Sequence, residues 1–146
     1  MPFTFRMQKI LDYREQLEEE AKIQVAQAQA KLKAANDHRA QTEQAIATAN
    51  QQRQENPTMS AQEFWVAEQY MRGLNDDLRQ SIVEQTMAEG ILAEAKKLLA
   101  IRAIDKKMLI KLKERQHAAW IRDEKTKEQH VNDEIATIRY KKAPAG

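Results

Sequence analysis

Three histidines, His38, His117 and His130, are the side chains of this chain best suited to metal binding or proton transfer at neutral pH. A metal site on a helix places two of them four residues apart, so that both point from one face, and no pair here has that spacing. We therefore expect all three to be solvated helix residues, with no metal site.

Carboxylates are densest in the run Glu18–Glu20. Consecutive residues point in three directions around a helix, so the run predicts a solvated face rather than a cation site. The chain has no cysteine and no glycine-rich phosphate loop. No serine–histidine–aspartate arrangement can be assembled on a few helices without a pocket-forming element. We expect no catalytic residues, no cofactor and no enzyme activity.

The composition predicts long helices instead of a compact mixed fold. The chain has 146 residues, of which 32% are charged and 5% aromatic, and only three glycines and three prolines. Ala, Glu, Gln, Lys, Arg and Leu, the strong helix formers, dominate it. A bias of this kind with so few turn residues is typical of an all-α protein, and the length fits one domain.

Charge and hydropathy exclude several partner classes. The net charge is only +2, and acids are mixed among the bases, which argues against nucleic-acid binding and against a membrane-surface helix. No apolar run approaches the roughly 20 residues that span a bilayer, and the start MPFTFRMQK lacks a signal-peptide layout. The absence of cysteine suits a reducing compartment. We expect a cytoplasmic protein.

One strong break divides the pattern, at ENPTMSAQE, residues 55–63. Pro57 disfavours helix at the preceding residue. Ser60 and Glu63 have the spacing of a capping box, and Met59 and Phe64 that of a hydrophobic staple. The sequence therefore predicts helix one over residues 3–55, a hinge at 56–60, helix two over 61–140 and a disordered tail at 141–146.

Apolar and small residues recur three and four positions apart on both sides of this hinge, which is a heptad pattern. Two such helices joined by a short loop form an antiparallel coiled-coil hairpin, in which the second helix is the longer. If residues 55 and 60 flank the turn, the facing pairs are Ile46 with Met71, Thr42 with Leu74 and Ala28 with Ala88. Many of these residues are alanine, so we expect a thin seam.

This register leaves the end of helix two without a partner. About 30 residues, or about 45 Å at the rise of an α-helix, extend beyond the start of helix one. Residues 111–142 hold nine Lys or Arg against six Asp or Glu. The pattern predicts an unpaired basic helix with an apolar row awaiting another protein, made of Leu112, Trp120, Val131, Ile135 and Ile138.

Phe64, Trp65 and Tyr70 form an aromatic cluster just after the hinge. Phe64 and Trp65 are adjacent, so they diverge by about 100° around a helix and cannot both enter one thin seam. At least one aromatic side chain is expected to be exposed near the hinge. Exposed aromatic residues favour contact with partners.

The chain resembles the flagellar FliJ family, a component of the type III export apparatus, over nearly its whole length. The resemblance is carried by the opening FTFRMQKILDYREQLEEEAK and by two later segments, FWVAEQYMRGLNDDL and AKKLLAIRAIDKKMLIKLKERQ. It implies a stalk similar to that of the rotary ATPase γ subunit, here without a globular insert between the helices. It also implies three partners: the flagellar export ATPase, whose ring the terminal half enters, the export gate membrane protein, and export chaperones.

The resemblance assigns two sets of contact residues, and places the protein at the cytoplasmic face of the inner membrane through its partners only. The expected contacts to the ATPase ring are Phe3, Phe5, Leu112, Arg115, Trp120, Arg122, Val131, Ile135 and Ile138. The expected contacts of the hinge region to the export gate are Phe64, Trp65, Tyr70 and Leu74. Two alternatives stay open: the related stalk of a virulence type III secretion system, and a coiled-coil scaffold unrelated to secretion.

Overall fold

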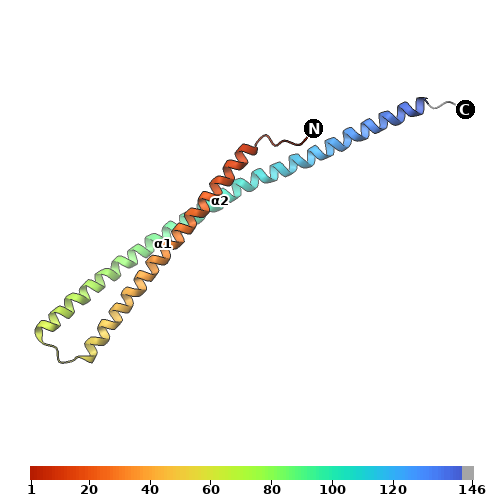
Figure 1. The fold of residues 1–146 in the computed structure, drawn as a ribbon. Helices are drawn as coiled ribbons and strands as arrows, with labels where there is room; N and C mark the ends of the chain where they lie inside the picture. Colours follow the sequence, from red (N-terminus) through yellow and green to blue (C-terminus); the bar gives the residue numbers. More distant parts are fainter. Residues whose placement is uncertain (143–146) are drawn as a thin grey trace. The chain divides into compact units, whose positions relative to one another are not determined.

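Two α-helices make up the fold. In the computed structural model, which describes residues 1–142, α1 spans Gln8–Glu55 and α2 spans Ala61–Lys142. They run antiparallel and pack against each other, and α2 is the longer, which confirms the predicted all-α hairpin (Figure 1). The chain divides into two compact units. We call Glu18–Ile101 the hairpin unit, and residues 1–17 with those from Arg102 onward the terminal unit.

The loop of the hairpin unit covers residues 56–60 and ends in a capping box. The Ser60 hydroxyl accepts a hydrogen bond from the Glu63 backbone N–H at 3.1 Å. The Glu63 carboxylate accepts one from the Ser60 N–H at 3.4 Å. The first intrahelical bond of α2 then runs from the Phe64 N–H to the Ser60 carbonyl at 2.9 Å. The reciprocal pair is the one predicted from the spacing of Ser60 and Glu63.

Removal of this cap is expected to lower the stability of the protein by a modest, measurable amount. The substitution Ser60→Ala leaves a backbone N–H of the first turn without its side-chain acceptor, and is expected to lower the free energy of unfolding by about 1 kcal/mol. Urea denaturation followed by circular dichroism measures it. Thr58→Ala, in the same loop, is the control; equal stability of the Ser60→Ala and Thr58→Ala proteins would show that the cap is not used in solution.

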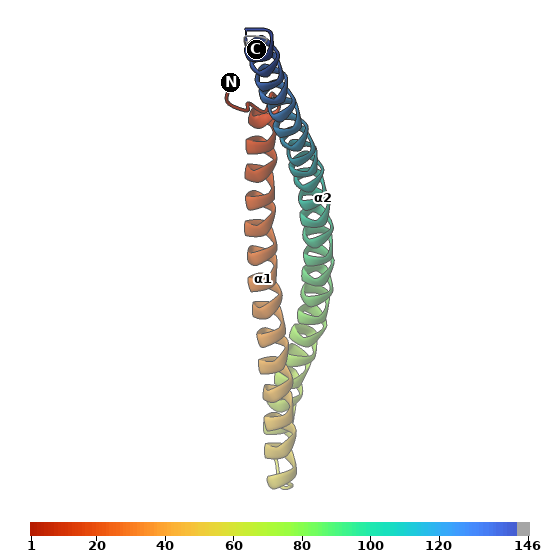
Figure 2. The same cartoon turned by 90° about the vertical axis from the view of Figure 1, so that its right-hand side faces the viewer.

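The two helices run alongside each other in Figure 2. A seam of buried and half-buried residues runs along both of them in the hairpin unit. Its members alternate steps of three and four, which confirms the heptad pattern. On α1 they include Ala21, Val25, Ala28, Leu32, Ala35, Arg39, Thr42, Ile46 and Ala49, and on α2 Met71, Leu74, Leu78, Ser81, Gln85, Ala88, Leu92, Ala95 and Leu99. The fully buried apolar residues of this unit are all alanines. The seam is therefore as thin as predicted.

Contacts across the seam show a register different from the predicted one. Arg39 donates from Nη1 to Oε1 of Gln85 at 2.6 Å, and Arg53 forms an ion pair with Glu68. Each partner on α2 lies at least one helical turn, roughly four residues, beyond the position predicted to face it.

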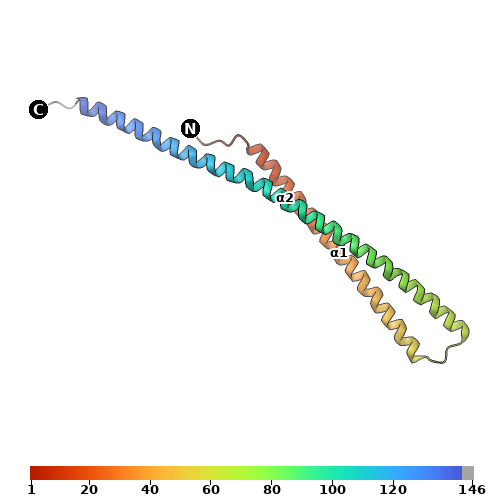
Figure 3. The same ribbon diagram turned by 180° about the vertical axis from the view of Figure 1, so that it is seen from behind.

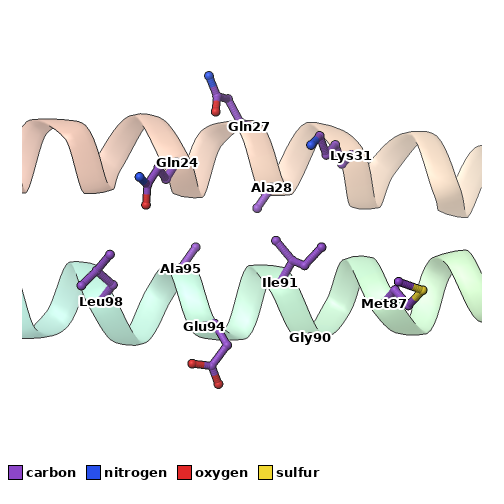
Figure 4. A pocket seen from close by; sticks show the side chains of 10 residues that line it. All are labelled: Gln24, Gln27, Ala28, Lys31, Met87, Gly90, Ile91, Glu94, Ala95 and Leu98. Atoms are coloured by element: carbon purple, nitrogen blue, oxygen red, sulfur yellow. The ribbon is translucent and has the colours of Figure 1, made fainter.

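Short side chains show the same displacement. Ala28 points between Ile91 and Ala95 in Figure 4, whereas the predicted partner was Ala88. The predicted pairing of Ala28 with Ala88 is therefore wrong by about one turn.

Packing explains the correction. The observed displacement sets a large residue against a small one at successive layers, whereas the predicted register sets alanine against alanine and leaves a void, which a close-packed interior does not tolerate. The prediction assumed that the last turn of α1 and the first turn of α2 lie side by side. The first turn of α2 instead lies past the end of α1. A shift of four residues from the predicted pairs would set Ala28 level with Leu92, Leu32 with Ala88 and Ala49 with Met71, in place of the predicted Ile46–Met71 and Thr42–Leu74 pairs.

The helix ends of the terminal unit also differ from prediction. Helix α1 begins at Gln8, not at residue 3. Phe3 and Phe5 would point about 200° apart on a helix but share a side in extended chain, and leaving the helix lets both reach α2. At the other end α2 continues to Lys142, two residues past the predicted end. Residues 143–146 of the predicted tail lie outside the described residues.

Candidate partner-binding surfaces

An apolar cluster holds the start of the chain onto α2 in the terminal unit. Phe5 is 5% exposed, Leu11 3% and Leu109 4%, and they are the fully buried large apolar side chains of the described chain. Phe3 and Leu112 pack at the edge of this cluster. Their burial makes this cluster the main apolar contribution to the stability of the terminal unit.

Three aromatic rings extend this cluster along α2. The centroid of the Phe3 ring lies 4.9 Å from that of His117 and 6.2 Å from that of Trp120. The His117 and Trp120 rings are 6.0 Å apart and nearly parallel. His117 was predicted to be a solvated helix residue; it is an exposed residue of α2, and its ring also contacts those of Phe3 and Trp120. We call residues 1–7 the N-terminal strap.

Polar contacts hold the first turns of α1 against α2. The ammonium of Lys113 donates to the side-chain carbonyl of Gln8 at 2.8 Å. The guanidinium of Arg14 donates to the backbone carbonyl of Asp105 at 2.7 Å. None of these residues was singled out in the sequence. Long polar residues at the edge of a seam give no periodic signal, so only the register could have indicated them.

Beyond Trp120 the residues of α2 up to 141 are exposed, apart from the half-buried Glu124, and Figure 3 shows this end of the helix, in blue, continuing past the start of the chain. Val131 is 54% exposed, Ile135 43% and Ile138 51%. Their spacing of four and three residues places them on one face of the helix. Arg115 and Arg122 are exposed as well. We call Val131, Ile135 and Ile138 the C-terminal stripe. All three are exposed, as predicted.

Two residues of the predicted apolar row have partners within the chain. Leu112 packs against the strap cluster, and Trp120 is half-buried beside Phe3. The prediction was wrong because the register is displaced and the strap continues along α2 ahead of α1. The unpartnered part of α2 is therefore about 20 residues, or about 30 Å, rather than about 30 residues.

The turn of the hairpin unit exposes several large apolar side chains. Phe64 is 53% exposed, Trp65 63%, Val66 55% and Tyr70 57%, whereas Leu74 is half-buried in the seam. The predicted exposure of at least one aromatic residue is confirmed. Three of the four residues predicted to contact the export gate are therefore exposed, whereas Leu74 is not. We call Trp65, Val66 and Tyr70 the tip patch.

Arg53 organises this end of the hairpin unit. Its guanidinium lies over the Phe64 ring, 5.0 Å from the centroid, and pairs with Glu68. The hydrogen bond from Arg53, and then its charge, hold the pKa of Glu68 below its ordinary value. The pair therefore stabilises the folded state at pH values above the ordinary pKa of a carboxyl group. This contribution is lost as the pH falls through the lowered pKa of Glu68.

The described residues hold no group of three or more metal-ligating side chains. Glu18 is not solvated as predicted: it is 6% exposed and pairs with Lys22 at 3.2 Å. His38 lies 3.7 Å from the carboxylate of Glu84, and His130 is exposed. In the same part of the chain, no helix is long and apolar enough to cross a membrane. The C-terminal stripe and the tip patch are the exposed apolar surfaces that contain predicted contact residues.

Comparison with known protein families gives a match over nearly the whole chain. The family model described as flagellar FliJ protein matches residues 3–145, which is nearly the whole chain. No curated protein and no solved structure matches the chain.

Proposed function

The chain belongs to the flagellar FliJ family, a family of flagellar and type III export components, and from that premise we propose that it is the stalk of a flagellar export ATPase. In this proposal the C-terminal stripe enters the ATPase ring and stimulates ATP hydrolysis. The tip patch contacts the export gate membrane protein, and the protein also escorts export chaperones. The single observation that carries the proposal is that each unit has an exposed apolar surface of its own, the C-terminal stripe in the terminal unit and the tip patch in the hairpin unit.

The C-terminal stripe has the chemistry of a helix that inserts into another protein. Val131, Ile135 and Ile138 are roughly half exposed on one helical face, and such rows are usually covered by a partner. Five Lys or Arg and three Asp or Glu lie between residues 125 and 142. The excess of bases favours an acidic lining in the ring and faster encounter with it.

The strap supports this role without contacting the ring. Phe3, Phe5, Leu112 and Trp120 were assigned to the ring contact, but they pack on one another in the terminal unit. We propose instead that they brace α2 at the point where its unpartnered part begins. Arg115, Arg122 and the stripe remain as ring contacts.

The tip patch offers the second contact surface. Tyr70 is 57% exposed and Trp65 63%, and amphipathic aromatic residues of this kind often anchor interfaces. The protein itself would lie in the cytoplasm and reach the inner membrane through the gate. The virulence type III stalk is the alternative within the same class, and the family match favours the flagellar system.

The experiment for the tip is a pair of substitutions. Tyr70→Ala is expected to weaken binding to the cytoplasmic part of the export gate by about tenfold, as for an interface anchor, with helicity and ATPase stimulation unchanged. Tyr13→Ala, at a residue 59% exposed in the terminal unit, is the matched control and should bind the gate normally. Titration by calorimetry measures both. Unchanged gate affinity of the Tyr70→Ala protein would remove the tip patch from the proposed interface.

A further inference from the structure

A groove runs along one side of the seam in the hairpin unit, away from the tip patch. Its floor is made of Ala28, Ala35, Ala88 and Ala95, whose side chains are too short to fill the space between the helices. Two adjoining hollows share Ala28, Lys31, Met87 and Ile91, so they form one continuous groove. Figure 4 shows the part between Gln24 and Lys31 on α1 and between Met87 and Leu98 on α2.

The two walls of this groove differ in chemistry. The wall on α2 is apolar: Met87 is 62% exposed, Ile91 53%, and Leu98 is half-buried. At Gly90 a β-carbon would meet nothing within 4 Å, so the edge of this wall is open. The wall on α1 is polar and carries Gln24 and Gln27. An occupant therefore needs an apolar edge toward α2 and a polar flank toward α1.

Charges on the walls are of opposite sign. Among the described residues Lys31 has no ion-pair partner, and it gives the α1 wall a positive charge. Glu94 gives the α2 wall a negative charge, which is only partly offset by Lys97 at 3.5 Å. The contact between the imidazole of His38 and the carboxylate of Glu84, at 3.7 Å, lies where the groove ends toward the loop. The groove thus spans residues 24–38 of α1, about 21 Å or four helical turns.

We propose that this groove binds one amphipathic helix of a partner protein, about four turns long. The partner helix carries Leu- or Met-sized residues on its buried edge, acidic residues on the flank over Lys31 and basic residues on the flank over Glu94. A third helix would cover the exposed Met87 and Ile91, which the two-helix seam leaves in water. The proposal uses neither the C-terminal stripe nor the tip patch, and it does not rest on the proposed function.

The probe is a synthetic helical peptide of about 18 residues, with leucine along one seam, Glu on one flank and Lys on the other. Its binding to the full chain is measured by fluorescence anisotropy, and its position by amide chemical shifts. The peptide is expected to bind and to shift residues 24–38 and 84–98. Peptides with both flanks basic, or both acidic, should bind about threefold less tightly, because one wall then repels them. Shifts confined to the tip patch or the C-terminal stripe would overturn the proposal, and equal affinity for all three peptides would overturn the charge assignment.

A matched pair of substitutions tests the site. Ile91→Glu places a charge in the apolar wall and is expected to weaken binding at least about tenfold. Val83→Glu places the same charge at a residue that is 57% exposed on the same helix but does not line the groove, and should have no effect. Met87→Glu is the second groove variant, and thermal melts confirm that all three proteins fold. Equal affinities of the Ile91→Glu, Met87→Glu and Val83→Glu proteins would show that the peptide binds elsewhere.

Discussion

A chain that ends at Glu124 is expected to fold normally but to lose its binding to the export ATPase. This truncation removes Val131, Ile135 and Ile138, which are roughly half exposed and have no partner in the described chain. It keeps Leu112 and Trp120, whose partners are in the strap. Loss of three apolar contact residues should weaken ATPase binding by about 100-fold or more. Stimulated ATP hydrolysis should fall to the unstimulated rate.

The control for this prediction keeps the full length of the chain and substitutes residues of the C-terminal stripe. Ile135→Asp and Ile138→Asp together should reproduce the loss, whereas Thr137→Asp between them should bind the ATPase as the full chain does. Circular dichroism checks that the helix persists in each protein. Full stimulation by the truncated chain would show that the end of α2 is dispensable, and the stalk assignment would fail.

The substitution Phe5→Ala is expected to have the largest effect on stability. Phe5 is 5% exposed and packs with Leu11 and Leu109, so truncation leaves a cavity in this buried apolar cluster. Large-to-small changes of this kind cost about 3–5 kcal/mol. Urea unfolding followed through Trp120 measures the terminal unit directly, in a background where Trp65 is replaced by Phe.

Tyr13→Ala is the matched control, because Tyr13 is an aromatic residue in the same unit and is 59% exposed. It should change the free energy of unfolding by no more than about 0.5 kcal/mol. If Phe5→Ala and Tyr13→Ala cost the same, the strap does not pack on α2 in solution. The bracing role proposed for it would then have no basis.

Local signals in the sequence predicted the elements of this fold. Heptad spacing gave the two helices, and Ser60 and Glu63 gave the cap, because each depends on residues a few positions apart. The register depended on a loop whose two ends are not level, and a displacement of one turn preserves the heptad pattern. In the sequence, the two registers differ only in whether large residues face small ones across the seam, whereas in the structure the contacts of Arg39 with Gln85 and of Arg53 with Glu68 distinguish them.

The strap was missed for a related reason. Phe3 and Phe5 continue an apolar pattern that a helix could use, and nothing local to them shows that they pack on residues about 110 positions later. The same miss made Trp120 look unpaired. By contrast, the exposure of the tip followed from two adjacent aromatic residues that no thin seam can hold, and Trp65 and Phe64 are indeed exposed.

The central claim is that the end of α2, and not the tip, meets the ATPase. The most direct measurement places a photo-crosslinking residue at Ile135 in one protein and at Trp65 in another, and irradiates each with the assembled ATPase ring and the export gate. Ile135 should crosslink to the ATPase, and Trp65 to the gate alone. Crosslinking of Trp65 to the ATPase, with none from Ile135, would contradict the claim.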